Sequence, residues 1–196
     1  MNKLSNVHIT TGSGKLQGIP SVNVSSLENE FCKIASQVKG SICSSCYSNR
    51  LSKMRKNLEI RLLGNSALLS ERILIESEIP TFNNRYVRFN SYGELINKTH
   101  MINLLNIARK NPYTTFGLWT KRADIVMEFN KEPNIKYIFS VSKVDGKCSN
   151  KRVLDYFDKV FIAMSSAEGT NCTTNCMSCM LCYTDNAVTV IKEKKK

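Results

Sequence analysis

The sequence contains little of several residue types on which common protein functions depend. Only two histidines and one tryptophan occur in 196 residues, and 16 acidic residues stand against 28 lysines and arginines. No apolar run reaches the length of about 18 residues that a membrane span needs, and the N-terminal residues do not resemble a signal peptide. We therefore expect a cytoplasmic protein that makes no membrane contact, in a compartment where thiols stay reduced. A disulfide framework is disfavoured for the same reason.

The scarcity of histidine also limits the catalytic chemistry. His8 and His100 have no cysteine or histidine at ligand spacing, and no histidine accompanies a thiol as its base. Since no nucleophile and base can be paired, no catalytic residue is assigned. His100 falls inside a predicted helix and is expected on the surface or partly buried. The string Gly12-Ser13-Gly14-Lys15 lacks the spacing of a Walker loop and predicts a turn.

Cysteine is abundant, and seven of the eight cysteines fall into two groups. The C-terminal group places four thiols within eleven residues, and the upstream group is a Cys-x-x-Cys pair preceded by a third cysteine. Such compact runs are typical of iron–sulfur clusters, whereas structural zinc usually takes two pairs separated by a dozen or more residues. We predict a 4Fe–4S cluster, with zinc as the alternative. The candidate metal ligands are Cys172, Cys176, Cys179, Cys182, Cys43, Cys46 and Cys32.

Two arrangements of these thiols are open. The two groups form independent sites, or Cys43 and Cys46 join two of the C-terminal cysteines in one four-thiolate site that connects distant parts of the chain. The remaining thiol, Cys148, is isolated and is expected to be a free loop cysteine.

The net charge of +12 and the pI near 9.4 favour a polyanionic partner, either nucleic acid or a host nucleoprotein complex. Part of this charge lies in the tail 192–196, which we expect to be a frayed end. A helix is predicted from Asn49 to about Ser77, with basic side chains off its apolar stripe. They form either a solvated face or a nucleic-acid-binding face. The candidate nucleic-acid contacts are Arg50, Lys53, Arg55 and Lys56.

Short apolar strands alternate with helices, which predicts an α/β fold over a single domain, residues 1–196. Helices are expected over 94–110, 123–129 and 152–157. With about five or six strands the chain is too short for a closed eightfold barrel, so we expect a partial (βα) barrel or an open parallel sheet. The cysteine-rich segment 172–183 is expected to pack on it. The predicted strands are 7–10, 20–24, 87–89, 115–119, 136–141 and 159–164.

Polar residues follow the predicted strands, at the edge where the loops of a parallel sheet converge. Helix capping accounts for many of them. Capping does not require an arginine within a strand or a lysine after Trp119. Trp119 itself is expected in the core or, alternatively, stacked on a base. The candidate ligand contacts are Arg88, Asn90, Ser91, Glu94 and Lys121.

Four motifs in this order carry a family resemblance. They are Ile42-Cys43-Ser44-Ser45-Cys46-Tyr47, Arg88-Phe89-Asn90-Ser91-Tyr92-Gly93-Glu94, Leu118-Trp119-Thr120-Lys121 and the cysteine cluster that ends in Cys182-Tyr183. From about Pro20 to Tyr183 the chain resembles the phage-associated gene product 88 family. The resemblance implies a phage or prophage protein in the cytoplasm of a bacterial host cell, with two recurrent cysteine groups and no established reaction.

A looser similarity connects the chain to radical S-adenosylmethionine enzymes, which use a partial barrel with three cysteines near the first strand. Cys32, Cys43 and Cys46 are similarly placed, although ten residues separate the first two here and only three do so in those enzymes. Gly93-Glu94 is similar to the Gly-Glu motif that binds the methionine amino group. This similarity implies S-adenosylmethionine as a ligand.

Two functions are therefore expected as alternatives. In the first, a metal-binding phage protein binds nucleic acid or a host nucleoprotein complex, as a counter-defence or regulatory factor. In the second, an iron–sulfur enzyme modifies or cleaves nucleic acid. The missing nucleophile favours the first, and the polar strand ends with two cysteine groups favour the second.

Overall fold

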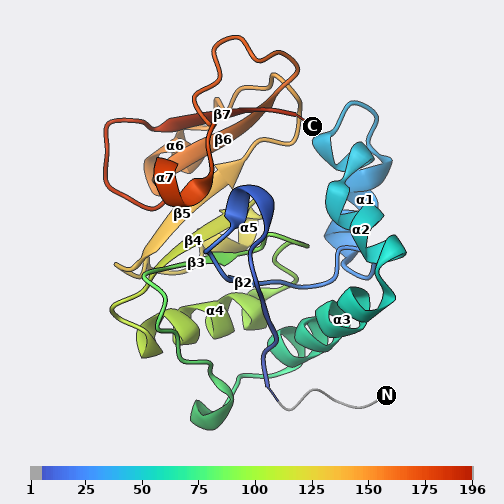
Figure 1. Cartoon of the computed structure of the whole chain (residues 1–196), viewed down its shortest axis with the longest axis vertical. Helices are drawn as coiled ribbons and strands as arrows, with labels where there is room; N and C mark the ends of the chain where they lie inside the picture. Colours follow the sequence, from blue (N-terminus) through green and yellow to red (C-terminus); the bar gives the residue numbers. More distant parts are fainter. Residues whose placement is uncertain (1–5, 196) are drawn as a thin grey trace.

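The computed structural model describes residues 6–195, which contain one open sheet of seven strands in the order of the sequence. β1 pairs with β2 in the antiparallel sense, and every later pair is parallel. Of the two predicted architectures, the structure has the open, mostly parallel sheet (Figure 1). The strands are β1 (Ile9–Thr10), β2 (Ser21–Val22), β3 (Tyr86–Phe89), β4 (Thr115–Thr120), β5 (Ile135–Ser140), β6 (Lys159–Met164) and β7 (Val190–Lys194).

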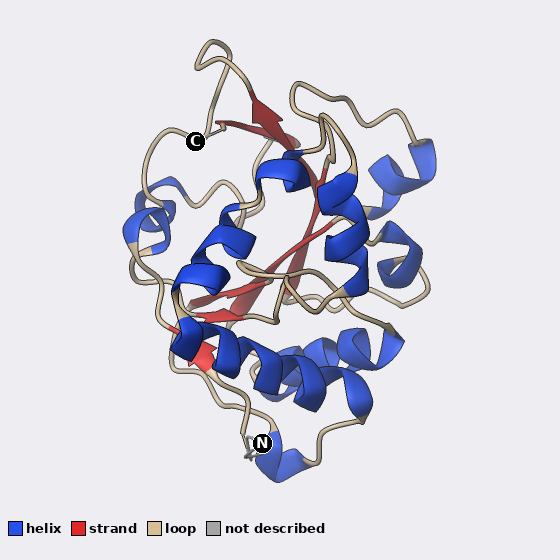
Figure 2. Ribbon diagram, turned by 90° about the vertical axis from the view of Figure 1, so that its right-hand side faces the viewer, coloured by secondary structure: helices blue, strands red, loops and turns tan. Residues whose placement is uncertain are grey.

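Helices surround the strands, which cross the middle of the molecule (Figure 2). Within residues 6–195, none of them has both the length and the apolar character needed to cross a bilayer. The helices are α1 (Glu30–Gln37), α2 (Tyr47–Met54), α3 (Lys56–Glu71), α4 (Lys98–Lys110), α5 (Ala123–Val126), α6 (Lys151–Tyr156) and α7 (Cys176–Cys179), with short 3-10 turns η1 (Gly14–Leu16), η2 (Ile42–Ser45) and η3 (Glu76–Glu78).

The sheet has one strand more than the predicted five or six, because the lysine-rich tail is not frayed as expected. Residues 190–194 instead form β7, which extends the sheet in parallel with β6 and places Glu193 opposite Ala163. Val190 and Ile191 supply the apolar part of the strand, and Ile191 is fully buried. Lysines suit the outer edge of a sheet, since they discourage pairing with a further strand. The other six strands lie where the sequence predicted them, within a few residues.

The predicted helix from Asn49 to Ser77 is two helices. Arg55 has φ −118° and ψ 80°, which is outside the helical region, so α2 ends there and α3 begins at the next residue. α3 already ends at Glu71, well before Ser77. The break turns α2, which carries Arg50 and Lys53 of the four predicted nucleic-acid contacts, away from the direction of α3 (Figure 1).

The helix predicted from Glu94 begins instead at Lys98. The Asn97 side chain accepts a hydrogen bond from the backbone N–H of His100 at 2.9 Å, which is the geometry of an N-cap. His100 is 1% exposed, so the expected surface or partly buried position was wrong. Its Nδ1 accepts the backbone N–H of Ile96 at 3.3 Å.

The two faces of the sheet carry cores of different size. On one face, alternate strand residues such as Val87, Phe89 and Leu118 pack against α3, α4, α5 and α6 in the main core. On the other face, Trp119 packs with residues from β5 and the C-terminal cysteine segment in a smaller core, whose members are Ile19, Trp119, Ile138 and Tyr183. Because this second face is only partly filled by side chains, it leaves room for a cavity.

Candidate functional site

A cavity of about 540 Å³, hereafter the cleft, opens at the carboxyl edge of the parallel strands. Its floor comes from residues at the ends of β3, β4, β5 and β6, the edge at which ligands of parallel α/β folds bind. The structure brings together at this cleft all five ligand contacts that the sequence predicted. They are Arg88, Asn90, Ser91, Glu94 and Lys121.

Six of the seven predicted metal-ligand cysteines line the same cleft, although the two groups are more than a hundred residues apart in sequence. Cys179 is the exception, because it does not line the cavity. All eight cysteines of the chain are unpaired. The cysteines that line the cleft are Cys32, Cys43, Cys46, Cys172, Cys176 and Cys182.

The upstream group, Cys32, Cys43 and Cys46, is fixed by contacts to the strand ends. η2 carries Cys43 and joins the end of β5, because the Ile42 N–H donates to the Ser142 carbonyl at 2.8 Å. Burial raises the pKa of the Cys32 thiol well above its usual value, and the charges of Glu94, Cys43 and Cys46 raise it further. These neighbours show that the three thiols and the Glu94 carboxylate share one environment.

The C-terminal group surrounds α7, whose N-cap is Asn175. Burial raises the pKa of Cys182 to about 12, and Arg88 opposes this while Cys172, Cys176 and Cys179 add to it. The other three cysteines of this group therefore all lie near Cys182. Tyr183, which follows the group, is 2% exposed and holds the segment against Trp119, with ring centroids 5.7 Å apart.

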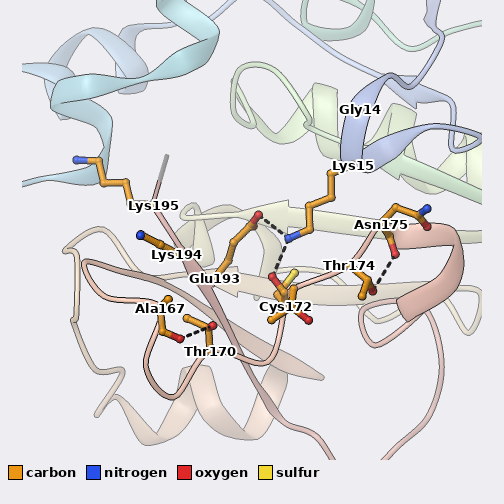
Figure 3. A pocket seen from close by; sticks show the side chains of 11 residues that line it. Gly14, Lys15, Ala167, Thr170, Cys172, Thr174, Asn175, Glu193, Lys194 and Lys195 are labelled. Atoms are coloured by element: carbon orange, nitrogen blue, oxygen red, sulfur yellow. Dashed lines mark hydrogen bonds and ion pairs between the residues drawn. The ribbon is translucent and has the colours of Figure 1, made fainter.

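Lys15 connects the N-terminal turn to the C-terminal cysteine segment. Its Nζ donates to the Glu193 carboxylate at 2.7 Å and to the Cys172 carbonyl oxygen at 2.8 Å (Figure 3). These residues also line a second, shallower cavity of about 620 Å³ next to the cleft, where the side chains of Lys194 and Lys195 lie. The turn predicted from Gly12-Ser13-Gly14-Lys15 is confirmed, since Gly14–Leu16 form η1. No role was predicted for Lys15.

Glu94 is a buried carboxylate, 5% exposed, whose oxygens are held by donors of the next strand. The Thr120 hydroxyl donates to Oε1 at 2.5 Å and the Lys121 N–H donates to Oε2 at 2.8 Å. Oε1 also accepts the N–H of Leu95 at 2.9 Å. An ionised carboxylate has about four acceptor positions, so one position of Glu94 remains for a donor in the cleft.

Gly93 is required for this placement of Glu94. Its φ of +73° lies in the left-handed region, and a Cβ there would lie 2.4 Å from the Val24 carbonyl oxygen. The adjoining turn is held by Asn23, whose Oδ1 accepts the N–H groups of Ser91 and Tyr92 at 2.8 and 3.0 Å. Asn23 was not singled out from the sequence, because no motif marks a buried asparagine that organises a turn.

Arg88 lies over the ring of Trp119, with the guanidinium carbon 3.9 Å from the ring centroid. Trp119 is 8% exposed, so the expectation of a core residue is confirmed. With Arg88 over the ring and Tyr183 packed nearby, little of the indole is accessible for stacking on a base. Lys121 reaches the end of β5, where its Nζ donates to the Ser140 hydroxyl at 3.1 Å.

The basic residues predicted to contact nucleic acid lie on α2 and at its junction with α3, beside the cleft. All four are exposed, and none forms an ion pair with a carboxylate in residues 6–195. Arg50 lines the cleft, whereas Lys53, Arg55 and Lys56 do not. The basic face therefore borders the cleft without forming its wall.

The thiols do not form a ready site for a single ion. Among residues 6–195, no three cysteine, histidine or carboxylate side chains are grouped closely enough to hold one metal ion. Zinc needs its ligands at about 2.0–2.3 Å from one point. The several irons of a cluster hold their cysteine sulfurs farther apart, and the donors here are all thiols. Thiolates are ligands of both zinc and iron–sulfur clusters, so both metals remain candidates for this donor set.

The comparison with known proteins gives a family assignment. No curated protein and no solved structure matches the chain significantly. The sequence matches the family described as Gene product 88 over residues 2–195, which is nearly its whole length. The chain therefore belongs to the Gene product 88 family.

Proposed function

We propose that the protein is an iron–sulfur enzyme of the radical S-adenosylmethionine-like kind, which modifies or cleaves nucleic acid at the cleft. One observation carries the proposal: the thiols of Cys32, Cys43 and Cys46 share one cleft with Glu94 at the carboxyl edge of a parallel sheet. Three thiolates in such a position would hold a 4Fe–4S cluster by three of its irons. When bound, that cluster supplies one-electron chemistry and one iron free for a ligand.

The residues of the cleft suit a zwitterionic ligand. Glu94 has one acceptor position left for an ammonium group, and the ammonium group of Lys121 has donors left for a carboxylate after its bond to Ser140. The second cysteine group, Cys172 to Cys182, would hold a separate cluster on the opposite wall.

A second candidate function is binding without catalysis. In it, the protein binds nucleic acid or a host nucleoprotein complex, and the metal stabilises the C-terminal segment. The observation that favours it is the exposed basic set on and next to α2, which lacks carboxylate partners in the described part of the chain and is free to contact phosphates. A counter-defence or regulatory role of a phage protein belongs to this function.

Purification without oxygen, followed by absorption spectroscopy and assays of iron, sulfide and zinc, tests the cofactor. Broad absorbance near roughly 400 nm with iron and sulfide in equal amounts is expected. The catalytic part is tested by incubating the reduced protein with S-adenosylmethionine and measuring methionine and 5′-deoxyadenosine. Formation of both, and its loss in Glu94→Gln, supports the enzyme. An iron-loaded protein that forms neither product supports the binding function instead, and a colourless zinc protein contradicts the iron–sulfur enzyme and also leaves the binding function.

A further inference from the structure

Arg88 lines the cleft, and its guanidinium group lies over the ring of Trp119. It forms no ion pair within residues 6–195, and its Nε is shielded from solvent yet makes no hydrogen bond to the described chain. Burial of a charged donor without an acceptor is unfavourable, because the donor loses water and gains nothing in exchange. A ligand with acceptor oxygens would resolve this deficit.

Ser91, two residues beyond the end of β3, has a second unpartnered donor. The residue is 6% exposed, and its Oγ makes no hydrogen bond within the described residues. Both Ser91 and Arg88 line the cleft. Arg88 lies over the ring of Trp119, and this cation–π contact restrains the guanidinium before any ligand binds. Two residues that line the cleft, one in β3 and one in the turn after it, thus each have a donor atom without a hydrogen-bond acceptor in the described chain.

The charges around Arg88 favour an anion of more than one charge. Both acidic side chains of the cleft are engaged, Glu94 by Thr120 and Lys121 and Glu193 by Lys15. The basic side chains Arg50, Lys194 and Lys195 line the cavity without carboxylate partners in the described part of the chain. Among the carboxylate and basic side chains of the cleft, the unpaired charge is therefore positive, as at sites that bind phosphates, and metal-bound thiolates would offset part of it.

We propose that Arg88 and Ser91 bind a phosphate group of the ligand, so that the cleft receives a nucleotide or the backbone phosphate of a nucleic acid. A guanidinium matches the oxygens of a phosphate with two parallel hydrogen bonds, and the serine hydroxyl adds a third donor. The inference deepens the proposed function by naming the substrate class of that same cleft. It does not require iron, since the donors belong to the chain.

Trp119 allows a direct test, because it is the one tryptophan of the chain and Arg88 lies on its ring. The protein as purified, with whatever metal it carries, is titrated with pyrophosphate, a nucleoside triphosphate and a single-stranded oligonucleotide at low salt. Tryptophan emission is recorded, and calorimetry gives an independent Kd. We expect saturable binding of at least one probe. Saturation by pyrophosphate and triphosphate assigns a nucleotide site, and saturation by the oligonucleotide alone assigns a backbone phosphate site.

Substitutions then locate the site. Arg88→Gln should weaken binding by at least about tenfold, and Arg88→Lys should recover part of it because the charge remains. Arg85→Gln is the matched control, since Arg85 is an exposed arginine at the other end of the same strand and does not line the cleft. Thermal unfolding of each variant shows that it is folded. Equal affinities of wild type and a folded Arg88→Gln, or no saturable binding of any probe, would overturn the proposal whether or not the protein contains iron.

Discussion

The side-chain amide of Asn29 donates a hydrogen bond to the backbone carbonyl oxygen of Glu94 at 2.7 Å. The Oδ1 of the same side chain caps α1 by accepting the N–H of Cys32 at 3.3 Å. Asn29 is 4% exposed, so water cannot easily replace these hydrogen-bond partners. One buried side chain thus couples the helix that carries a cleft thiol to the turn that carries the buried carboxylate.

Asn29→Ala should lower the free energy of unfolding by about 1–3 kcal/mol, because it removes an N-cap and leaves the Glu94 carbonyl oxygen without its donor. Asn29→Ser is the matched variant, since its hydroxyl oxygen can still cap α1 without adding a charge while the bond to Glu94 is lost, and its loss should be smaller. Urea unfolding measures both. An alanine variant within about 0.3 kcal/mol of wild type would contradict this role.

Gly93→Ala should be more destabilising than Gly40→Ala, although both glycines have positive φ, of +73° and +80°. The backbone conformation alone costs about 1–2 kcal/mol for an alanine. A Cβ at Gly40 meets nothing within 4 Å, whereas a Cβ at Gly93 lies 2.4 Å from the Val24 carbonyl oxygen. The additional loss at Gly93 measures that close contact. Equal losses of unfolding free energy in the two variants, measured by urea unfolding, would contradict a close contact at Gly93.

Stability should fall as the pH falls below about 6.5, the usual pKa of histidine, because of His100. Burial lowers the pKa of His100 to about 3. Between these values the unfolded chain binds a proton that the folded chain does not, so unfolding becomes easier by up to about 1.4 kcal/mol per pH unit. His100→Gln should have a flatter dependence of unfolding free energy on pH over this window. Parallel curves for the two proteins would contradict a neutral, buried His100.

Nucleic-acid binding, where it occurs, should depend on the basic residues at α2. Replacement of Lys53, Arg55 and Lys56 by glutamate should weaken binding and reduce the slope of log K against log salt by about 2–3. The control carries the same change of charge at three exposed basic residues on and beside α6, Lys147, Lys151 and Arg152. Equal effects of both triple variants would indicate that only the net charge matters.

The fold could be predicted largely from local patterns. Alternating apolar strands and helices indicated the parallel sheet, and the polar residues after β3 and β4 indicated where the cleft lies. β7 was missed because the lysines of an edge strand look like a frayed tail. The break at Arg55 was missed because the apolar spacing continues across it. Neither feature has a local signal strong enough to override the pattern around it.

The residues that line the candidate site could be named from the sequence, but their positions relative to one another in the folded chain could not. The sequence showed two cysteine groups but left open whether they were near each other, since only tertiary contacts such as Lys15 with Glu193 bring the C-terminal segment over the sheet. The roles of Asn23 and Asn29 could not be predicted either, because nothing in the sequence distinguishes a buried asparagine from one in a surface turn.

The iron content of four proteins purified without oxygen tests the central claim most directly: wild type, Cys43→Ser, Cys179→Ser and Cys148→Ser. Two clusters predict roughly eight irons in wild type, roughly four in each of the first two variants, and no change in Cys148→Ser, whose thiol lies outside both groups. Complete loss in both Cys43→Ser and Cys179→Ser would indicate one shared site. Wild-type protein with zinc and without iron would contradict the account.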